Sequence, residues 1–463
     1  MVPEQLLLSV NPATEEVIGS YPVHSKAQVE KALLAAKSAF AAWRFQPFAA
    51  RASHMKRAAG YLRQNQAQLA GIMTAEMGKP VVESEAEVEK CAWNCDYFAD
   101  HAERLLRDEP RSSNATESYI QYTPLGVLLA VMPWNYPLWQ VFRFAAPALM
   151  AGNTAVLKHA SNVSQCALSI ERVFREAGFP DGVFQTLLIP SSRVAQLIEH
   201  PVVAAVTLTG SEGAGSQVAS CAGRSIKKTV MELGGSDPFI VLEDADLEAA
   251  VQVGVRARYQ NTGQSCIAAK RFIVVESVLE EFQNRFIDAV GALKVGNPMD
   301  RSTQVGPLAR GEFLDDLERQ VRESTRQGAR LRIGGRRMSG KGYYFEPTVL
   351  TGVHPEMPAG CEEVFGPVAA ILSARDPQDA IRLANSTPYG LGSNLWTSDM
   401  ERAKRLARSI EAGQVFINGM VASDPRLPFG GVKRSGYGRE LSEFGLREFV
   451  NIQTVWVGPQ VKK

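Results

Sequence analysis

Four short apolar runs alternate with helical segments between residues 127 and 221, and this alternation limits the possible folds more than any other feature. The apolar runs occupy residues 127–131, 154–157, 182–188 and 204–208. Continuous apolar runs of this length are typical of strands buried on both faces of a parallel sheet. The segments expected to be helical are residues 139–150, 164–177, 192–200 and 213–221. The pattern predicts a doubly wound α/β domain.

A second block with the same alternation runs from about residue 239 to residue 421. Its expected strands are residues 239–242, 272–275, 368–372, 393–396 and 414–417, and its expected helices are 245–259, 278–292, 311–327 and 377–384. Helices are also expected at 26–43, capped by Ser25, and at 49–76 and 83–106. Extended segments are expected at 6–17, 118–122 and 448–457. A chain of 463 residues is long enough for two or three such units.

Charge and cysteine content narrow the class of protein. The formal net charge of +1 predicts no bulk attraction to nucleic acid or to acidic membranes. No apolar run approaches the roughly 18 residues of a membrane span, and the N-terminus has no basic segment of the kind found in secretory signals. The six cysteines are sparse and none forms a CxxC pair, so no metal site is expected. Sparse cysteines also indicate a reducing compartment, and we expect the cytoplasm.

One cysteine stands out by its local sequence, Gln260-Asn-Thr-Gly-Gln-Ser-Cys266. Gly263 allows a sharp turn, which could present the thiol to a cleft beside free backbone N–H groups. A cysteine nucleophile needs this access, together with a lowered pKa and donors for an oxyanion. The competing interpretation is a buried structural cysteine, because free cysteines are among the most buried residues.

Polar residues follow several of the expected strands, where open α/β sheets bind ligands. Asn135 could donate to an oxyanion, or it could be a turn residue between prolines. Lys158 could bind a ribose or a phosphate, Glu232 could act as a general base, and Glu363 could accept ribose hydroxyls. Each of these three could equally be a solvated charge. The glycine turn at 209–215 opens a helix, which is a natural phosphate site.

Taken together, these motifs resemble the NAD(P)-dependent aldehyde dehydrogenase superfamily over nearly the whole chain. The similarity extends from the Asn-Pro-Ala-Thr of residues 11–14 to the Gly-Arg-Glu of residues 438–440. Its most specific parts are the ELGG sequence at Glu232 and the GQxC sequence that ends at Cys266. The resemblance implies an α/β fold with two doubly wound parallel-sheet domains and a small β arm for oligomerisation. It assigns 1–110 and 124–235 to the dinucleotide-binding domain, 236–435 to the catalytic domain, and 111–123 and 436–463 to the arm.

The resemblance also implies the roles of individual residues. Cys266 attacks the aldehyde carbon, Asn135 and the Cys266 backbone N–H hold the oxyanion, and Glu232 activates the water that hydrolyses the resulting thioester. The cofactor, NAD or NADP, is expected to contact Trp134, Lys158, Ser161, Gly210, Ser211, Gly215, Leu233, Glu363 and Phe365. Ser161 stands where NAD-preferring members often carry a glutamate that repels a 2′-phosphate, so NADP should be tolerated. A homodimer or homotetramer is expected, because the arm strands need partners.

Within the superfamily the chain looks most like bacterial succinate-semialdehyde dehydrogenases. Arg143 matches an arginine that grips the substrate carboxylate there, and Ser423 matches a serine that does the same; Trp139 and Phe429 are expected to line the pocket. A second arginine often lies six residues before the cysteine, but Gln260 occupies that position, and Arg426 is a possible substitute. The alternatives are glutarate semialdehyde or an aromatic aldehyde as substrate, a CoA-acylating enzyme, and a non-catalytic binding protein.

Overall fold

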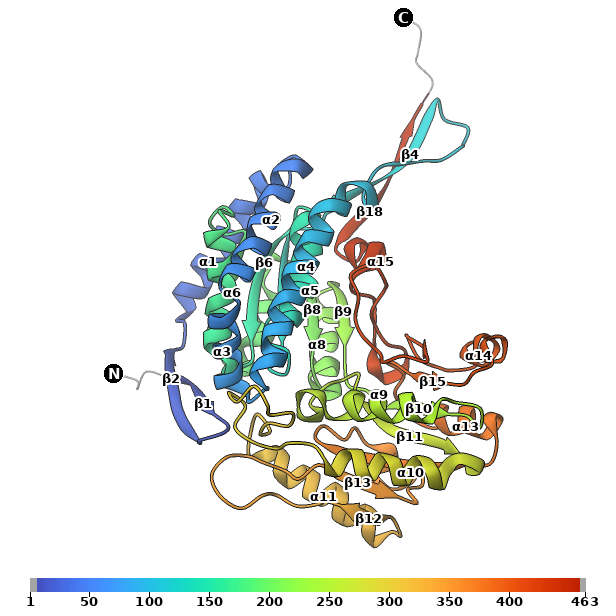
Figure 1. The fold of residues 1–463 in the computed structure, drawn as a ribbon. Helices are drawn as coiled ribbons and strands as arrows, with labels where there is room; N and C mark the ends of the chain where they lie inside the picture. The colour runs from blue at the N-terminus through green and yellow to red at the C-terminus, as the bar shows by residue number, and fades with distance from the viewer. Residues whose placement is uncertain (1–5, 459–463) are drawn as a thin grey trace, which may run out of the picture.

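The computed structural model of the protein describes residues 6–458, which form two α/β lobes and a projecting β arm (Figure 1). The first lobe contains a six-stranded sheet with the order β17-β9-β8-β5-β6-β7 among the described residues. Its strands are β5 (Val127–Met132), β6 (Thr154–His159), β7 (Phe184–Thr186), β8 (Val203–Thr209), β9 (Lys228–Glu232) and β17 (Gly436–Tyr437). The four predicted apolar strands are therefore present. They pair in parallel, and only β17, at one edge, is antiparallel.

Helices cover both faces of this sheet, as a doubly wound fold requires. They are α1 (Lys26–Trp43), α2 (Phe48–Gln64), α3 (Gln66–Met77), α4 (Val81–Leu105), α5 (Trp139–Met150), α6 (Ser164–Glu176), α7 (Val194–Glu199) and α8 (Glu212–Arg224). Ser25 caps α1 with a full capping box, as predicted. The single helix predicted at 49–76 is wrong, because the chain breaks at Asn65. Asn65 adopts a non-helical conformation, with φ −111° and ψ 19°, and its side-chain amide donates to the Tyr61 carbonyl at 2.9 Å.

The second lobe contains a seven-stranded sheet with the order β12-β13-β14-β11-β10-β15-β16 in the part of the chain that is described. Its strands are β10 (Asp237–Val241), β11 (Ala269–Val275), β12 (Arg330–Ile333), β13 (Thr348–Thr351), β14 (Val368–Ala374), β15 (Asn394–Trp396) and β16 (Phe416–Ile417). Its helices are α9 (Leu247–Tyr259), α10 (Glu276–Gly291), α11 (Glu312–Arg326), α12 (Pro358–Cys361), α13 (Pro377–Asn385) and α14 (Met400–Ala407). The strands are again parallel except for one edge strand, β12. The predicted α/β fold class is confirmed.

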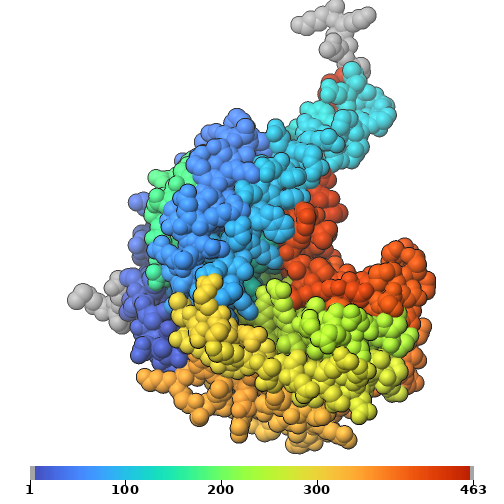
Figure 2. Space-filling view, in the orientation of Figure 1, coloured from blue at the N-terminus to red at the C-terminus, as the bar shows by residue number. Residues whose placement is uncertain are grey.

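The arm projects from the body of the molecule (Figures 1 and 2). It is a three-stranded antiparallel sheet of β3 (Glu109–Pro110), β4 (Glu117–Pro124) and β18 (Val450–Val457). Strand β18 pairs with β4 along all of its length, from Val450 opposite Pro124 to Val457 opposite Glu117. A short helix, α15 (Ser442–Arg447), leads into β18, and a separate hairpin of β1 (Leu6–Asn11) and β2 (Glu16–Pro22) lies near the N-terminus. No helix among residues 6–458 is long and apolar enough to cross a membrane.

Candidate active site

The cysteine predicted as nucleophile lies just after a left-handed turn between α9 and β11. Three consecutive residues of this turn have positive φ: Asn261 (54°), Thr262 (56°) and Gly263 (72°). A Cβ on Gly263 would come within 2.4 Å of the Gly366 carbonyl oxygen, so glycine is required there, as the sequence suggested. Two non-glycine residues in this conformation store strain, which is characteristic of functional sites.

Buried hydrogen bonds hold this turn in place. The Asn261 backbone N–H donates to the Glu83 carboxylate at 2.7 Å, and the Asn261 amide donates to the carbonyls of Asn135 (2.8 Å) and Gln264 (3.0 Å). The strained backbone is therefore held by groups from α4 and from the loop after β5, far away in the sequence. These contacts compensate the cost of the left-handed turn and fix the position of the thiol.

A buried lysine that the sequence did not single out holds the backbone at Cys266. The ammonium of Lys270, at the start of β11, donates to the carbonyls of Ser265 (2.9 Å) and Cys266 (2.7 Å). It also lies 3.3 Å from a carboxylate oxygen of Glu363. The Cys266 sulfur points away from Glu363, and the polar network therefore fixes the backbone while the thiol remains free to react.

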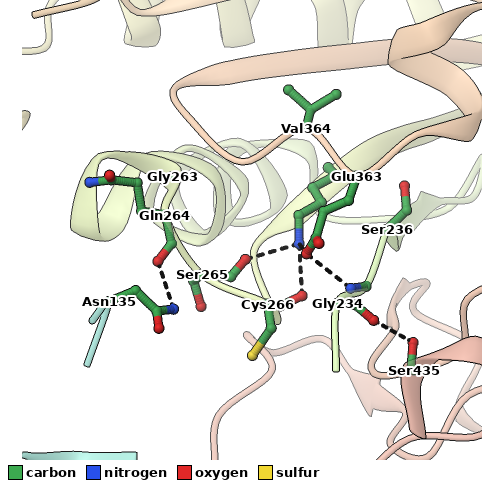
Figure 3. Close-up of polar contacts among 12 residues, drawn as sticks. Asn135, Gly234, Ser236, Gly263, Gln264, Ser265, Cys266, Glu363, Val364 and Ser435 are labelled. Atoms are coloured by element: carbon green, nitrogen blue, oxygen red, sulfur yellow. Dashed lines mark hydrogen bonds and ion pairs between the residues drawn. The ribbon is translucent and has the colours of Figure 1, made fainter. Parts of the chain in front are cut away.

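Asn135 is oriented by the same region of the structure. Its side-chain oxygen accepts a bond from the Gln140 amide at 3.0 Å, and its Nδ2 donates to the Gln264 carbonyl at 3.0 Å. The bond from Gln140 shows which side of the amide is the oxygen, so the NH₂ group faces the cysteine loop (Figure 3). One of its two N–H bonds is used by Gln264, and the other can donate to an oxyanion at Cys266.

Cys266 lines two cavities at once, one of about 730 Å³ and one of about 140 Å³. Burial raises the pKa of its thiol to about 12, and the carboxylates of Glu232 and Glu363 act in the same direction against Arg143 and Lys270. In the protein alone, burial therefore acts against the lowered pKa that a cysteine nucleophile needs. Desolvation outweighs the two nearby cations, so the thiol needs a base or an added positive charge before it can react.

The larger cavity lies at the carboxyl ends of β5, β8 and β9, where an open α/β sheet binds a dinucleotide. Of the nine residues predicted to contact the cofactor, six line it: Trp134, Gly210, Ser211, Leu233, Glu363 and Phe365. Ser211 caps the N-terminus of α8 by accepting a bond from the Ala214 N–H, which leaves the positive end of the helix dipole beside the cavity. A Cβ on Gly234 would lie 2.2 Å from Glu363, so glycine lets the Glu363 carboxylate lie close against the backbone of this wall.

Three predicted cofactor residues do not line this cavity. Gly215 lies within α8 and packs against Leu233, where a Cβ would come within 2.4 Å of that side chain. Glycine is needed at position 215 because α8 packs closely against the residue that follows β9. Lys158 is the penultimate residue of β6 and is 7% exposed, and burial lowers its pKa. Ser161 lies three residues further along, at the start of a short 3-10 helix. Both lie at the strand next to β5, beyond the walls of the cavity.

Helix α11 and the segment after α12 complete the larger cavity; Glu363 and Phe365 of that segment were predicted, but the contribution of α11 was not. The Trp134 ring stacks on Phe313 at 5.1 Å between centroids, and Phe365 approaches Trp134 edge-on at 5.8 Å. Arg319 binds Glu362 at 2.7 Å. In the sequence α11 appears only as an amphipathic helix, and nothing in it shows which turn faces a ligand.

The smaller cavity contains every residue predicted to contact the substrate: Trp139, Arg143, Ser423 and Phe429, with Gln260 beside them. A cavity of about 150 Å³ can hold a benzene-sized molecule, so this one suits a short aldehyde. Arg426, proposed as a substitute for the missing arginine, is not among the lining residues and donates to Asp424 at 2.8 Å. Glu83, Glu87 and Lys90, all from α4, also line the cavity and were not predicted.

Arg143 is not a free cation, contrary to what the sequence suggested. It is 2% exposed, forms an ion pair with the carboxylate of Glu440, and lies over the Phe429 ring at 4.5 Å. Its charge is thus already balanced within the protein. Glu440 lies 297 positions further along the chain, so only the folded structure brings the two together.

The ion pair leads to a prediction for stability. Arg143→Met should lower the free energy of unfolding by about 3–5 kcal/mol near pH 8, because it leaves the buried Glu440 without a counter-charge. Burial raises the pKa of Glu440, so protonation relieves the loss in acid and the variant should be closer to the wild type at pH 5. Thermal unfolding of both proteins at the two pH values measures this. An equal loss at both would show that Glu440 is not the cause.

The predicted base, Glu232, ends β9 and is 1% exposed. Both of its carboxylate oxygens lack a hydrogen-bond partner among residues 6–458. Desolvation raises the pKa of Glu232 to about 8, opposed by Arg143 and reinforced by Glu440. A Cβ on Gly430 would lie 2.9 Å from Glu232 Oε1, so glycine at this position leaves room for the carboxylate. The carboxylate lines neither cavity, so it has to rotate to reach an acyl group on Cys266.

Comparison with known proteins agrees with this geometry. The aldehyde dehydrogenase family profile matches residues 3–455. A Synechocystis protein named a probable succinate-semialdehyde dehydrogenase (NADP+) is 53% identical, over 97% of this chain and 99% of its own. A Mycobacterium avium succinate-semialdehyde dehydrogenase (NADP+) is 52% identical, over 98% and 97%. The crystal structure of the Streptococcus pyogenes succinic semialdehyde dehydrogenase with NADP+ has a TM-score of 0.96 at 37% identity, covering 98% and 100%.

The match spans nearly the whole chain, and the buried cysteine turn, the oriented amide and the paired cavities lie within it. The protein therefore belongs to the aldehyde dehydrogenase family.

Proposed function

We propose that this protein oxidises succinate semialdehyde to succinate, with NADP+ as the electron acceptor. One observation carries the proposal: Cys266 is the point at which a cavity suited to a dinucleotide meets a small cavity lined by Lys90 and Arg143. The relatives named above act on the same aldehyde according to their names, and they match over almost their whole length.

In this mechanism the Cys266 thiol gives its proton to solvent water, and its sulfur attacks the aldehyde carbon. The oxyanion that forms accepts hydrogen bonds from Asn135 Nδ2 and from the Cys266 backbone N–H. A nicotinamide held beside Glu363 and Phe365 would supply the acceptor for the hydride of the same carbon. A thioester on Cys266 remains, and Glu232 takes a proton from water. The hydroxide attacks the acyl carbon and the C–S bond breaks, which releases succinate and the Cys266 thiolate. The net reaction consumes one aldehyde, one oxidised cofactor and one water.

The dinucleotide fits the first lobe of the protein. Residues 1–110 and 124–235 are proposed to form its binding domain, with Trp134, Ser211, Glu363 and Phe365 around the cofactor, while 236–435 carry the nucleophile. Lys158 and Ser161 are proposed to face the adenosine ribose at the end of β6. Gly215 is proposed to let α8 approach Leu233 closely enough for the helix N-terminus to face the phosphates.

The substrate carboxylate is proposed to lie at the far end of the small cavity, near Ser423, Trp139 and Phe429. Arg143 contributes positive charge to this wall, although Glu440 balances most of it. We also propose a cytoplasmic homodimer or homotetramer assembled through segments 111–123 and 436–463. The arm exposes Ile452 (61%) and Trp456 (51%), which a partner strand would cover.

A substrate panel tests the function directly. Succinate semialdehyde, glutarate semialdehyde, benzaldehyde and neutral short aldehydes are each supplied with NAD+ or NADP+, without CoA, and the reduced nicotinamide is followed by its absorbance. We expect the highest kcat/KM for succinate semialdehyde with NADP+. A preference for an aromatic or a neutral aldehyde, or an absolute need for CoA, would contradict the proposal.

The cofactor preference depends on Ser161. Ser161→Glu should lower kcat/KM for NADP+ by about 100-fold and change that for NAD+ by less than about 3-fold, because a carboxylate there repels the 2′-phosphate. Ser161→Gln is the matched control, because glutamine has a similar size to glutamate and no charge. Its kcat/KM for NADP+ should fall much less. Steady-state kinetics with both cofactors measures the ratio. An equal loss with both cofactors would place the adenosine ribose elsewhere.

A further inference from the structure

The wall of the small cavity contains a lysine that the mechanism above does not use. Lys90 lies on α4 and lines the same cavity as Cys266. Its ammonium donates to the Ser423 hydroxyl oxygen at 2.8 Å and lies over the Trp139 ring at 4.4 Å. Helix α4, the start of α5 and the loop before residue 430 therefore converge on this one cation.

The charges of this wall differ in how they are balanced. Glu87 pairs with the buried Lys79 and also accepts the backbone N–H groups of Leu138 and Trp139, each at 2.9 Å. Arg143 is paired with Glu440. Within residues 6–458, no carboxylate lies within 4.0 Å of the Lys90 ammonium. Lys90 is thus a cavity cation whose charge has no direct partner, and a half-buried charge of this kind favours an anionic ligand.

The hydrogen bond from Lys90 leaves the Ser423 hydroxyl proton free to act as a second donor. An ammonium has only N–H donors, so the Ser423 oxygen must accept and its own proton must point elsewhere. Ser423 is 5% exposed and lines the cavity, so this proton is available to a ligand there. One ammonium and one hydroxyl side by side are suited to the two oxygens of a carboxylate.

We propose that Lys90, together with Ser423, binds the carboxylate of the substrate and sets the preference for ω-carboxylated aldehydes over neutral ones. This inference rests on the proposed function, since it names the group that recognises the acid end of the same substrate. The thiol at one part of the cavity and the ammonium at another then define the length of the aldehyde chain that fits.

The titration of Lys90 gives the proposal a second signature. Burial lowers the pKa of Lys90 to about 8, and Arg143 acts in the same direction; Cys91, Glu87 and Asp424 oppose them. The ammonium is therefore charged at neutral pH and loses its charge as the pH rises through about 8. KM for the carboxylated aldehyde should rise above that pH, while KM for a neutral aldehyde should not.

The test compares two substrates that differ in charge and by one methyl group. Succinate semialdehyde carries the carboxylate, and its methyl ester, methyl 4-oxobutanoate, does not. In Lys90→Gln, kcat/KM for the acid should fall by about 10- to 100-fold, mainly through KM, because a charge-assisted hydrogen bond is lost. The value for the ester should change by less than about 3-fold. Lys90→Arg keeps the charge and should retain most of the preference for the acid.

Controls separate this inference from the function on which it rests. Lys404→Gln removes an exposed lysine on α14 and should change kcat/KM for neither substrate. Thermal unfolding and the rate with the ester show whether Lys90→Gln is folded. If the wild type does not prefer the acid to the ester, the proposed function fails. If the wild type prefers the acid and Lys90→Gln keeps that preference with the same pH dependence of KM, the role of Lys90 is wrong while the function stands. If Lys90→Gln loses activity with both substrates equally, Lys90 is structural.

Discussion

Replacing Glu232 with glutamine is expected to stop turnover after one burst of reduced cofactor. Cys266 and Asn135 are unchanged, so acylation and hydride transfer should proceed once in each active site. The thioester should then persist, because the base that activates water is missing. We expect the steady-state rate to fall by about 10²- to 10⁴-fold. Rapid mixing measures the burst, and the intact mass of the quenched protein measures the acyl group.

The pH dependence identifies Glu232 more directly. Its pKa is raised to about 8, and only the carboxylate can act as a base, so the wild-type deacylation rate should rise with pH until about 8 and then level off. Glu232→Gln should lack this rise. A variant that loses the burst as well as the steady state would instead place Glu232 in acylation.

Glu232 should also make the stability of the protein depend on pH, and stability should fall over the pH range in which the deacylation rate rises. A carboxylate whose pKa is raised in the folded protein contributes stability at low pH, and that contribution is lost as the pH rises through the folded pKa. The wild type should therefore lose stability between about pH 5 and pH 9 relative to Glu232→Gln. Denaturant unfolding at the two pH values measures the difference. A constant difference would mean that Glu232 is not buried in its charged form.

Cys266→Ala is expected to abolish both the burst and the steady state, with a loss of at least about 10⁴-fold, because no other side chain can form the thioester. Cofactor binding should persist, since the larger cavity is built mainly from other residues. Fluorescence titration with NADP+ measures the binding. Cys361, which lines the same cavity, offers a matched control, and Cys361→Ala should keep most of the activity. Residual turnover in Cys266→Ala near the wild-type level would remove the cysteine from the mechanism.

Sequence patterns predicted β5, β6 and β8, because each of these buried strands contains an apolar run. They did not predict β12, whose sequence Arg-Leu-Arg-Ile lies at an exposed edge and has neither an apolar run nor a clear alternation. The break at Asn65 was also missed, because one asparagine does not interrupt the helical spacing of apolar residues. Tertiary packing and a local side-chain bond decided both cases.

The site shows the same division between local and distant information. Cys266, Asn135 and Glu232 lie in recognisable local sequences, so their roles could be proposed from the chain alone. Lys90 and Lys270 could not be found in this way. Lys90 stands beside Glu89 in an ordinary amphipathic helix, and Lys270 stands beside another cation in a strand. Their importance depends on partners at Ser423, Cys266 and Glu363, which only the fold brings near.

Hydrogen bonds at the site join residues that are far apart in the sequence, and this has a consequence for the order of assembly during folding. The Asn261 amide reaches the Asn135 carbonyl across 126 residues, and Lys90 reaches Ser423 across 333. Contacts between segments this far apart form late, because the entropy of closing large loops is lost before they stabilise anything. Both lobes must therefore be largely complete before the left-handed turn is held. A refolding chain should regain its helices and its buried aromatic residues first and its catalytic activity last.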